Sequence, residues 1–336
     1  MSKYVLVRLQ RIELLDIGHF EFDPNVTVYF FVINADEHIY LRYGGRDDAS
    51  PESYINLKSL EVALDRGLDQ HKLWQDGKLP AAPRAPAKFV KDYQEIREGP
   101  LKKNGCVHCH MIGQGITGDL IRTGKLDKRV DPWVYPDVKQ LGIILDAEKG
   151  LVVKDSSGAA KKAGLGKKDE ITKLNGKQVL TFGDLQYALN QVKHDAAELE
   201  LTVKRGKEEA AVVTIALDKL WRVTQIERRA TTQRLEPFPE FWGKSLSSDA
   251  RKAAGLKPNG LSVEVGKFWV KTNAQAAGLQ VGDVVYSVDG VEEDEYTQTA
   301  VLYIKLNKNT GDTVKLGVLR KGKKLEVSFK LKAKPW

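Results

Sequence analysis

The residues best suited to chemistry are two cysteines and a histidine that lie close together in the chain. Cys106, Cys109 and His110 form a Cys-x-x-Cys-His sequence, and the chain has no other cysteine. Two thiols at this spacing can add to the vinyl groups of a haem while the adjoining histidine ligates the iron. The pattern therefore predicts a covalent c-type haem, with Cys106 and Cys109 as thioether anchors and His110 as the iron ligand.

Other chemistries fit the same residues. The two thiols could form a dithiol or disulfide couple. They could also be half of a zinc site that His108 or His110 and a distant histidine complete. The spacing could, finally, be accidental.

A haem would have a second axial position, which the sequence leaves open. Met111 adjoins His110 and cannot easily reach the opposite haem face, so methionine ligation would need Met1. The remaining candidates are the distant histidines, or no ligand at all. These histidines are His19, His38, His71 and His194.

The segment that carries these cysteines is short. Residues 80–136 begin as a proline- and alanine-rich linker, run into an expected helix over Phe89–Glu98 and end at Trp133-Val134-Tyr135-Pro136. We expect a haem here to pack against neighbouring parts of the chain, under Trp133 and Tyr135.

Residues 1–79 have an α/β pattern. Strands are expected at Tyr4–Leu9, Val26–Val32 and Ile39–Tyr43, with a hairpin turn at Asn34–Glu37. Ser50–Ser53 predicts the start of a helix. Its apolar face would follow from leucines spaced three and four apart, at Leu57, Leu60, Leu64 and Leu68.

This order of strand, hairpin and closing helix resembles the C-terminal half of a thioredoxin-like domain. Two features of that family are missing here. No cysteine precedes the hairpin, and Val26 stands where the family has a cis-proline. We therefore expect no thiol-disulfide oxidoreductase activity from this part, and we expect the front half of the domain to be missing.

Two stretches of the chain repeat one pattern. Residues 137–217 and 244–332 each contain Ala-Gly-Leu, a Lys-Asp or Gly-Asp pair followed by hydrophobic residues, a tight turn and a strand pair with a basic turn. The tight turns are Asn175-Gly176 and Asp289-Gly290. Residues 218–243 connect the two copies.

Both copies resemble bacterial PDZ domains, in which a peptide adds a strand to a sheet edge. The resemblance implies a partner that offers a C-terminal or extended peptide. In the first copy, Leu141-Gly142-Ile143 would capture the peptide carboxylate, and Ile144-Leu145 would pair with its backbone. The facing wall would be the helix over Thr181–Leu189, with Leu185 and Leu189 on one face. These two leucines could instead belong only to the core.

The second copy is matched to the family less directly. Ala253-Ala254-Gly255-Leu256 is taken as its loop and Leu261–Val265 as its strand. This copy could pack against its neighbour instead of binding peptide.

Composition narrows the choice of partner. The formal net charge is +8, but lysines alternate with acidic residues, and the densest basic cluster, Arg320–Lys324, has the pattern of a hairpin turn. We therefore expect no nucleic-acid partner, while an anionic membrane surface stays possible. No Gly-x-Ser-Gly nucleophile sequence occurs, so peptidase activity and catalytic residues are not expected.

The complete order resembles a group of bacterial thioredoxin-like/PDZ domain-containing proteins. The fold class expected is multidomain α+β: a partial thioredoxin-like segment, a short helical Cys-x-x-Cys-His segment and two β-rich PDZ domains. The function expected is non-proteolytic peptide binding with a haem as a redox-linked adaptor. The alternatives are a scaffold with zinc or a disulfide at the cysteines, and a degenerate oxidoreductase.

The expected compartment depends on the cysteine motif. Haem is attached covalently outside the cytoplasm, so a periplasmic or otherwise exported protein is expected. The residues MSKYVLVRLQ do not have a signal-peptide pattern, and without a haem we would expect a cytoplasmic protein.

Overall fold

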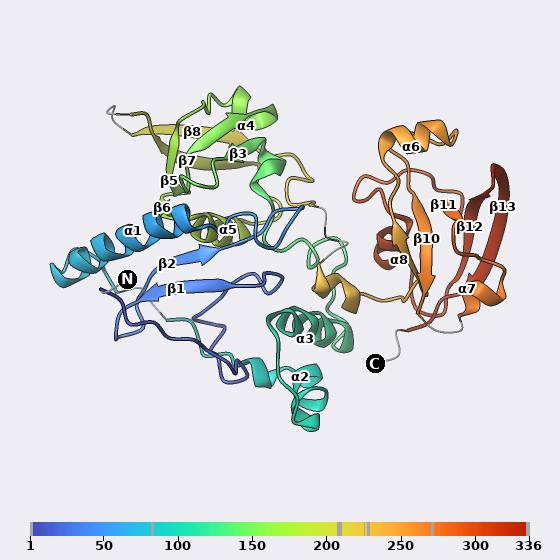
Figure 1. Ribbon diagram of the computed structural model, residues 1–336, viewed down its shortest axis with the longest axis horizontal. Coiled ribbons are helices and arrows are strands. Elements are labelled where there is room, and N and C mark those ends of the chain that lie inside the picture. The colour runs from blue at the N-terminus through green and yellow to red at the C-terminus, as the bar shows by residue number, and fades with distance from the viewer. Residues whose placement is uncertain are drawn as a thin grey trace. The chain divides into compact units, whose positions relative to one another are not determined.

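The computed structural model describes residues 3–81, 84–206, 210–224, 226, 229–269 and 272–333. The chain divides into two compact units, Met1–Thr231 and Thr232–Trp336. The first unit contains a small hairpin with its helix, the cysteine segment and a β-rich body, and the second contains another β-rich body (Figure 1).

The N-terminal part is a two-stranded hairpin with one helix. β1 (Tyr29–Ile33) and β2 (Ile39–Gly44) pair antiparallel, which confirms the predicted hairpin. α1 (Leu57–Gln75) packs on it, and a small buried cluster joins Leu41 of the hairpin to Ala63 of the helix.

The strand predicted at Tyr4–Leu9 is wrong. These residues form no strand, and the side chains of Val5 and Val7 are 90% and 79% exposed. Strand residues need a pairing partner for their backbone groups, and the hairpin does not supply one to this segment.

The start and the buried face of α1 also differ from the prediction. The helix begins at Leu57, because the side chain of Asn56 accepts a hydrogen bond from Ser59 N (2.9 Å) as the N-cap. The buried positions are Ser59, Ala63, Gly67 and Gln70, and Leu57 is 80% exposed. Small side chains let the helix lie close to the hairpin: an added Cβ at Gly67 would be 2.9 Å from the Val32 side chain.

The cysteine segment consists of short helical pieces. They are η1 (Val90–Asp92), α2 (Gln94–Glu98), η2 (Leu101–Lys103) and α3 (Cys109–Arg122). The helix predicted over Phe89–Glu98 is divided in two, because Tyr93 is extended, with φ −71° and ψ 128°. α3 packs closely on α2 through Gly115 and Gly118, where an added Cβ would touch Tyr93 and Glu95.

The first β-rich body follows from Val138 to Ala216. It contains a two-stranded sheet in the order β3-β4 and a four-stranded sheet in the order β6-β5-β7-β8. Its elements are η3 (Val138–Leu141), β3 (Ile143–Leu145), β4 (Val153–Ser156), α4 (Gly158–Lys162), β5 (Glu170–Leu174), β6 (Lys177–Gln178), α5 (Phe182–Asn190), β7 (Glu198–Lys204) and β8 (Ala211–Ala216).

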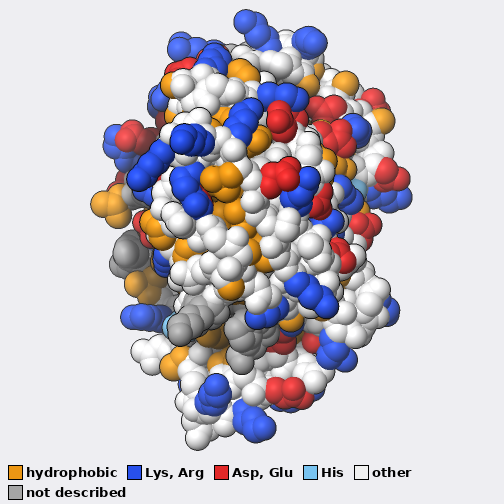
Figure 2. All heavy atoms as spheres, turned by 90° about the vertical axis from the view of Figure 1, so that its right-hand side faces the viewer, with side chains coloured by type: hydrophobic (Ala, Val, Ile, Leu, Met, Phe, Trp, Pro, Cys, Tyr) orange, Lys and Arg blue, Asp and Glu red, His pale blue; other side chains and the backbone are white. Residues whose placement is uncertain are grey.

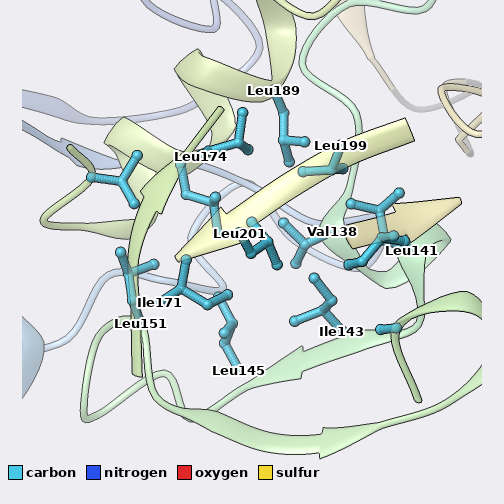
Figure 3. Packing of buried hydrophobic residues seen from close by; sticks show 14 of the residues in the cluster. Val138, Leu141, Ile143, Leu145, Leu151, Ile171, Leu174, Leu189, Leu199 and Leu201 are labelled. Atoms are coloured by element: carbon cyan, nitrogen blue, oxygen red, sulfur yellow. The ribbon is translucent and has the colours of Figure 1, made fainter. Parts of the chain in front are cut away.

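Apolar side chains from both sheets and from α5 fill the centre of this body (Figure 3). Val138, Leu151, Val203 and Ile215 are fully buried. Burial at this level contributes about 1.5–3 kcal/mol for each large aliphatic side chain. The body therefore has a core of its own.

The second β-rich body lies in the second unit. Its sheet has the order β13-β12-β11-β10-β9, so β9 and β13 are the edge strands. Its elements are β9 (Phe241–Lys244), α6 (Ser248–Ala253), β10 (Val263–Phe268), α7 (Asn273–Ala276), β11 (Val284–Val288), α8 (Ala300–Asn307), β12 (Thr313–Arg320) and β13 (Lys323–Lys330). η4 (Ala230–Arg234) precedes them.

Hydrogen bonds show which residues of the two bodies correspond. Val153 N donates to Asp169 O, and Val265 N donates to Asp283 O, each at 2.8 Å. β4 therefore corresponds to β10. Because β3 pairs with β4 and β9 pairs with β10, β9 is the counterpart of β3.

This correspondence corrects the prediction for the second copy. Ala253–Leu256 is not the loop before the pairing strand, because α6 ends there and Gly255 closes it with φ 68°. Leu261–Val265 runs into β10, which lies inside the sheet. The edge strand β9 covers Phe241–Lys244, whereas the sequence pattern predicts a connector up to residue 243 and the repeat from residue 244.

The hairpin between β12 and β13 confirms the basic turn. Lys321 and Gly322 have φ values of 48° and 78°, as a two-residue turn requires. On the face drawn in Figure 2, basic and acidic side chains are both present.

No helix in the described part of the chain is both long and apolar enough to cross a bilayer.

Candidate functional site

The predicted carboxylate loop lies where η3 turns into β3. Gly142 has a φ of 80°, and a Cβ atom there would collide with the Ser157 carbonyl group. The Gly142 carbonyl accepts a hydrogen bond from Ser157 N (2.8 Å), which ties the loop to the start of α4. Glycine suits this position because it adopts a positive φ without steric cost and has no Cβ atom to collide with Ser157.

The predicted pairing strand has one open edge. β3 pairs with β4 on one side, and in the described part of the chain its other side has no strand partner. Ile144 is 41% exposed on this strand. An edge of this kind is what an added peptide strand requires.

The other predicted groove residues lie deeper. Leu141, Ile143, Leu185 and Leu189 belong to one buried cluster, and Leu185 and Leu189 are each 1% exposed. Leu141, Ile143 and Leu189 are labelled in Figure 3. The structure thus brings the loop, the strand and the helix together. That a peptide reaches the two leucines of α5 stays a prediction.

A segment of the N-terminal part lies against the same elements. We call Gly45–Asn56, which links β2 to α1, the groove segment. At its start, an added Cβ on Gly45 would be 2.6 Å from the Phe182 ring. Arg46 N donates to Gln186 Oε1 (3.2 Å), and Gln186 Nε2 donates to Arg46 O (2.9 Å), so the segment is bonded directly to α5.

Tyr54 is the apolar anchor of the groove segment. Its ring is stacked on that of Phe182 at the start of α5, with centroids 3.4 Å apart and an interplanar angle of 10°. Tyr54 is 7% exposed and belongs to the buried cluster that contains Leu141 and Leu185. Burial raises the pKa of its hydroxyl group above the usual range.

Two carboxylates of the groove segment lie beside the carboxylate loop. Lys139 of η3 bonds to Asp47 Oδ2 (2.8 Å) and to Asp48 Oδ1 (3.2 Å). Asp48 N donates to Asp137 Oδ2 (3.2 Å). Burial tends to raise the pKa of Asp47, but hydrogen bonds from Lys139, Ser53 and Ser50 outweigh it and lower the pKa to about 2. Asp47 is therefore ionised at neutral pH.

The groove segment ends at the turn that follows β3. Asn56, the N-cap of α1, donates through Nδ2 to Ala147 O (2.7 Å). Beyond it, Lys58 pairs with Glu148 (2.6 Å), and Arg66 bonds to Glu170 and to the Leu180 carbonyl. The segment therefore touches the first body at both ends of β3.

β2 covers a further face of α5. Arg42 N donates to Asp184 Oδ1 (2.9 Å), and the Arg42 guanidinium lies 3.8 Å from the centre of the Tyr187 ring. Burial raises the pKa of Asp184 to about 6, although hydrogen bonds from Arg42 N, Leu180 N and Thr181 act in the opposite direction. α5 is thus covered by its own body on one face and by the N-terminal part on the other.

Sequence reasoning did not find these contacts. They join residues 45–56 to residues 137–186, which no local pattern links. The one local signal is Gly44-Gly45, a pair that by itself predicts only the end of a strand. Their φ values of 133° and 112° show that both glycines are needed to turn the chain toward α5.

The second body has a different loop. Glu240 precedes β9 at the position that Gly142 holds before β3, and its φ is 71°. Glu240 is 3% exposed, and its Oε2 accepts a hydrogen bond from Ala274 N (3.0 Å) in α7. A buried carboxylate therefore belongs to this loop. Trp242, which follows on β9, is 45% exposed.

The comparison with protein families assigns both β-rich bodies to one domain family. The PDZ domain family model matches residues 139–215 and 253–331. The chain therefore contains two PDZ domains, which we call PDZ1 and PDZ2. No curated protein matches the chain.

The solved structures that match this chain are only distantly similar to it. A variant of the HtrA-type protease AlgW with a decapeptide is 20% identical, with a TM-score of 0.26 over 41% of this chain and 42% of that one. The HtrA-type protease AlgW with a decapeptide is 15% identical, with a TM-score of 0.25 over 51% and 57%. An aminopeptidase N family protein from Idiomarina loihiensis is 22% identical, with a TM-score of 0.21 over 28% and 14%. This chain therefore covers less than two thirds of the length of each of these three structures.

The cysteine motif lies at the start of α3. Cys106 is exposed, Cys109 is partly buried, and both are free thiols. His110 is partly buried; its Nδ1 is sheltered from solvent and has no hydrogen-bond partner in the described part of the chain. Burial first, and His108 second, lower the pKa of His110, which favours the neutral imidazole that binds metals.

The structure does not gather the histidines around this motif. His19 bonds to Glu37 O, His38 stacks on Trp74, and His71 bonds to Tyr40. Burial lowers the pKa of His194 to about 4. In the described residues no cluster of three or more potential metal ligands occurs, and Met1 lies outside them. The tyrosine predicted to cover a haem, Tyr135, donates to Glu21 Oε1 (3.2 Å).

Proposed function

We propose that this protein is a non-proteolytic adaptor that binds peptide segments of other proteins through its PDZ domains. The observation that carries the proposal is the edge strand β9, which ends a five-stranded sheet whose other strands lie within the PDZ match to residues 253–331. PDZ domains bind peptides by adding a strand to such an edge. The HtrA-type protease AlgW, which is similar over about half of this chain, has been solved with a decapeptide.

Two tryptophans near β9 offer a matched test. Trp242 lies on the edge strand and is 45% exposed, and Trp269 lies just after β10 and is 51% exposed. Lys267 Nζ is 5.5 Å from the first ring and 4.7 Å from the second. The two side chains therefore differ chiefly in whether they belong to the edge.

The experiment uses the full chain and a library of fluorescein-labelled decapeptides. A peptide that binds is then tested by anisotropy on Trp242→Ala and Trp269→Ala. We expect Trp242→Ala to weaken binding at least tenfold and Trp269→Ala to leave it within twofold. Equal effects of the two substitutions, or no binding peptide at all, would contradict strand addition at β9.

We propose, second, that Cys106, Cys109 and His110 hold a covalent c-type haem, which gives the adaptor a redox role and implies export. The free thiols and the unpartnered Nδ1 of His110 support this choice. The two thiols would form the thioether bonds, and His110 would ligate the iron, which supplies electron transfer. The N-terminal hairpin and α1 are, in the same proposal, the remnant of a thioredoxin-like domain.

Visible absorption and haem staining test this second proposal on protein made with haem-maturation machinery. We expect a covalently bound chromophore that Cys106→Ala with Cys109→Ala abolishes. A colourless wild-type protein that contains stoichiometric zinc would favour the scaffold alternative, and a reversible Cys106–Cys109 disulfide would favour the oxidoreductase.

A further inference from the structure

We propose that the groove segment, Gly45–Asn56, is the resident ligand of PDZ1, and that an external peptide enters this groove only by displacing it. The proposal rests on the proposed function, because it names what the first domain binds. It also names the class of competitor: an acidic, tyrosine-containing internal peptide that resembles the segment itself.

The path of the segment supports this assignment. It contacts Lys139 before the carboxylate loop, Phe182 and Gln186 on α5, and Ala147 after β3. A PDZ ligand lies between this loop, this strand and this helix. The segment therefore contacts α5 and the residues that flank the carboxylate loop and β3 on both sides.

The chemistry of the segment also matches that of a PDZ ligand. Such a ligand presents a carboxylate to the loop and an apolar side chain to a pocket. The segment is internal and has no terminal carboxylate, but Asp47 and Asp48 place two carboxylates at Lys139. Tyr54 places an aromatic ring against Phe182 and inside the buried cluster.

The segment is held without strand addition. In the described residues β3 pairs only with β4, and the bonds to PDZ1 run through side chains of Asp47, Asn56 and Gln186 and through few backbone groups. An external strand could form the ladder that the segment lacks. Tethering at β2 and at α1 raises the local concentration of the segment, so a competitor has to overcome an intramolecular contact.

Occupation of the groove by the segment has a measurable effect on the affinity of PDZ1 for an external peptide. A peptide that binds only the open form has an apparent Kd that is raised in inverse proportion to the open fraction. Weakening the contacts of the segment raises that fraction. The apparent affinity of PDZ1 then increases although no residue of β3 or of the carboxylate loop has changed.

The probe is a fluorescein-labelled synthetic peptide with the sequence of residues 45–56, titrated into the full chain. Tyr54→Ala removes the aromatic anchor, and Tyr54→Phe keeps the ring as the matched control. Asp48→Asn weakens the other end of the segment at a half-exposed side chain, so it opens the groove without removing a buried group and without changing Lys139, to which the probe would bind. Thermal unfolding shows that each variant is folded.

We expect Tyr54→Ala to bind the probe at least tenfold more tightly than the wild type, and Tyr54→Phe to match the wild type. If Tyr54→Ala does not fold, Asp48→Asn is expected to bind the probe at least threefold more tightly than the wild type. The proposal would be overturned if these variants fold but bind the probe no more tightly than the wild type does.

The failure of this proposal can be told apart from the failure of the proposed function. The Trp242→Ala test reports on PDZ2 alone. If library peptides bind at β9 while the opened variants of PDZ1 gain nothing, only the resident-ligand proposal is wrong. If neither domain binds any peptide, both proposals are wrong.

Discussion

PDZ1 and PDZ2 share a common order of strands and helices, to which PDZ1 adds β6 and PDZ2 adds α6, but their surroundings differ. In PDZ1, α5 is packed on its own core and also on β2, and a segment of the same chain lies at the carboxylate loop. In PDZ2, Glu240 replaces the loop glycine, and Trp242 is exposed on the edge strand. A shared PDZ pattern therefore specifies the elements of the groove, while the residues that surround each domain determine what lies against them.

The largest expected effect tests whether the two domains are separate folding units. Leu189→Ala and Ile304→Ala each remove a side chain that is at most 1% exposed. We expect each to destabilise its own unit by about 2–5 kcal/mol, because it loses burial and leaves a cavity. Denaturant unfolding with domain-specific probes measures this. Val212→Ala and Val281→Ala, at exposed positions, are the controls, and equal shifts of both units would contradict the comparison.

A smaller effect is expected in the pH dependence of stability, which should differ between the two domains. The pKa of Asp184, raised by burial to about 6, means that the folded first unit holds this proton more tightly than the unfolded chain. The contribution to stability is fully present below the unfolded pKa of about 3.8 and is lost as pH rises through 6, in total about 3 kcal/mol. α8 of PDZ2 has no acidic residue.

We therefore expect Asp184→Asn to flatten the fall in stability of the first unit between about pH 4 and pH 6. Urea unfolding at several pH values measures the slope, with Asp155→Asn, an exposed position on β4, as the control. An unchanged slope in Asp184→Asn would show that this carboxyl group titrates normally.

The aspartate that begins the central strand gives a third contrast. Asp283 accepts bonds of 2.7 Å from both Arg320 Nε and Nη2, while the corresponding bonds of Asp169 to Arg205 are 3.2–3.3 Å. Charge-assisted bonds are stronger when shorter. We expect Asp283→Asn to cost about 2 kcal/mol and Asp169→Asn about 1 kcal/mol in thermal unfolding. The exposed substitution Asp249→Asn serves as the reference, and a larger cost at Asp169 would reverse this ranking.

The smallest expected effect on stability is that of replacing Glu240, the loop residue of PDZ2. Glu240→Gly relieves a positive φ but loses the bond from Ala274 N, so we expect a change in stability within about 1 kcal/mol. Gly142→Ala is the reciprocal test and should cost about 1–3 kcal/mol, because it adds a collision with Ser157 to an unfavourable φ. Equal costs would show that the two loops have the same requirement.

Glu240→Gly also bears on binding by PDZ2. Removing a buried carboxylate from the loop removes a like charge from the place where a terminal carboxylate would bind. We expect the variant to gain affinity for a free C-terminus over its amidated form, which paired peptides measure by anisotropy. No difference between the paired peptides would show that Glu240 does not select against terminal carboxylates.

Local patterns predicted the elements that local interactions form. The β1–β2 hairpin follows from alternating residues and a turn at Asn34–Glu37, and α5 follows from its Thr181 N-cap and apolar face. The strand at Tyr4–Leu9 failed because pairing needs a partner, and the start of α1 failed because Asp47 holds Ser50 and Ser53 in a turn. The edge strand of PDZ2 was missed because Glu240 stands where the pattern expects glycine.

The sequence alone was sufficient to predict two PDZ domains, because turn glycines, a capped helix and hydrophobic spacing are set by residues near one another. It also placed Cys106, Cys109 and His110 side by side. The tertiary structure was needed to show that Tyr54 stacks on Phe182 and that Asp47 pairs with Lys139. Those contacts depend on how the N-terminal hairpin docks on α5, and docking depends on the summed fit of distant surfaces that no local spacing records.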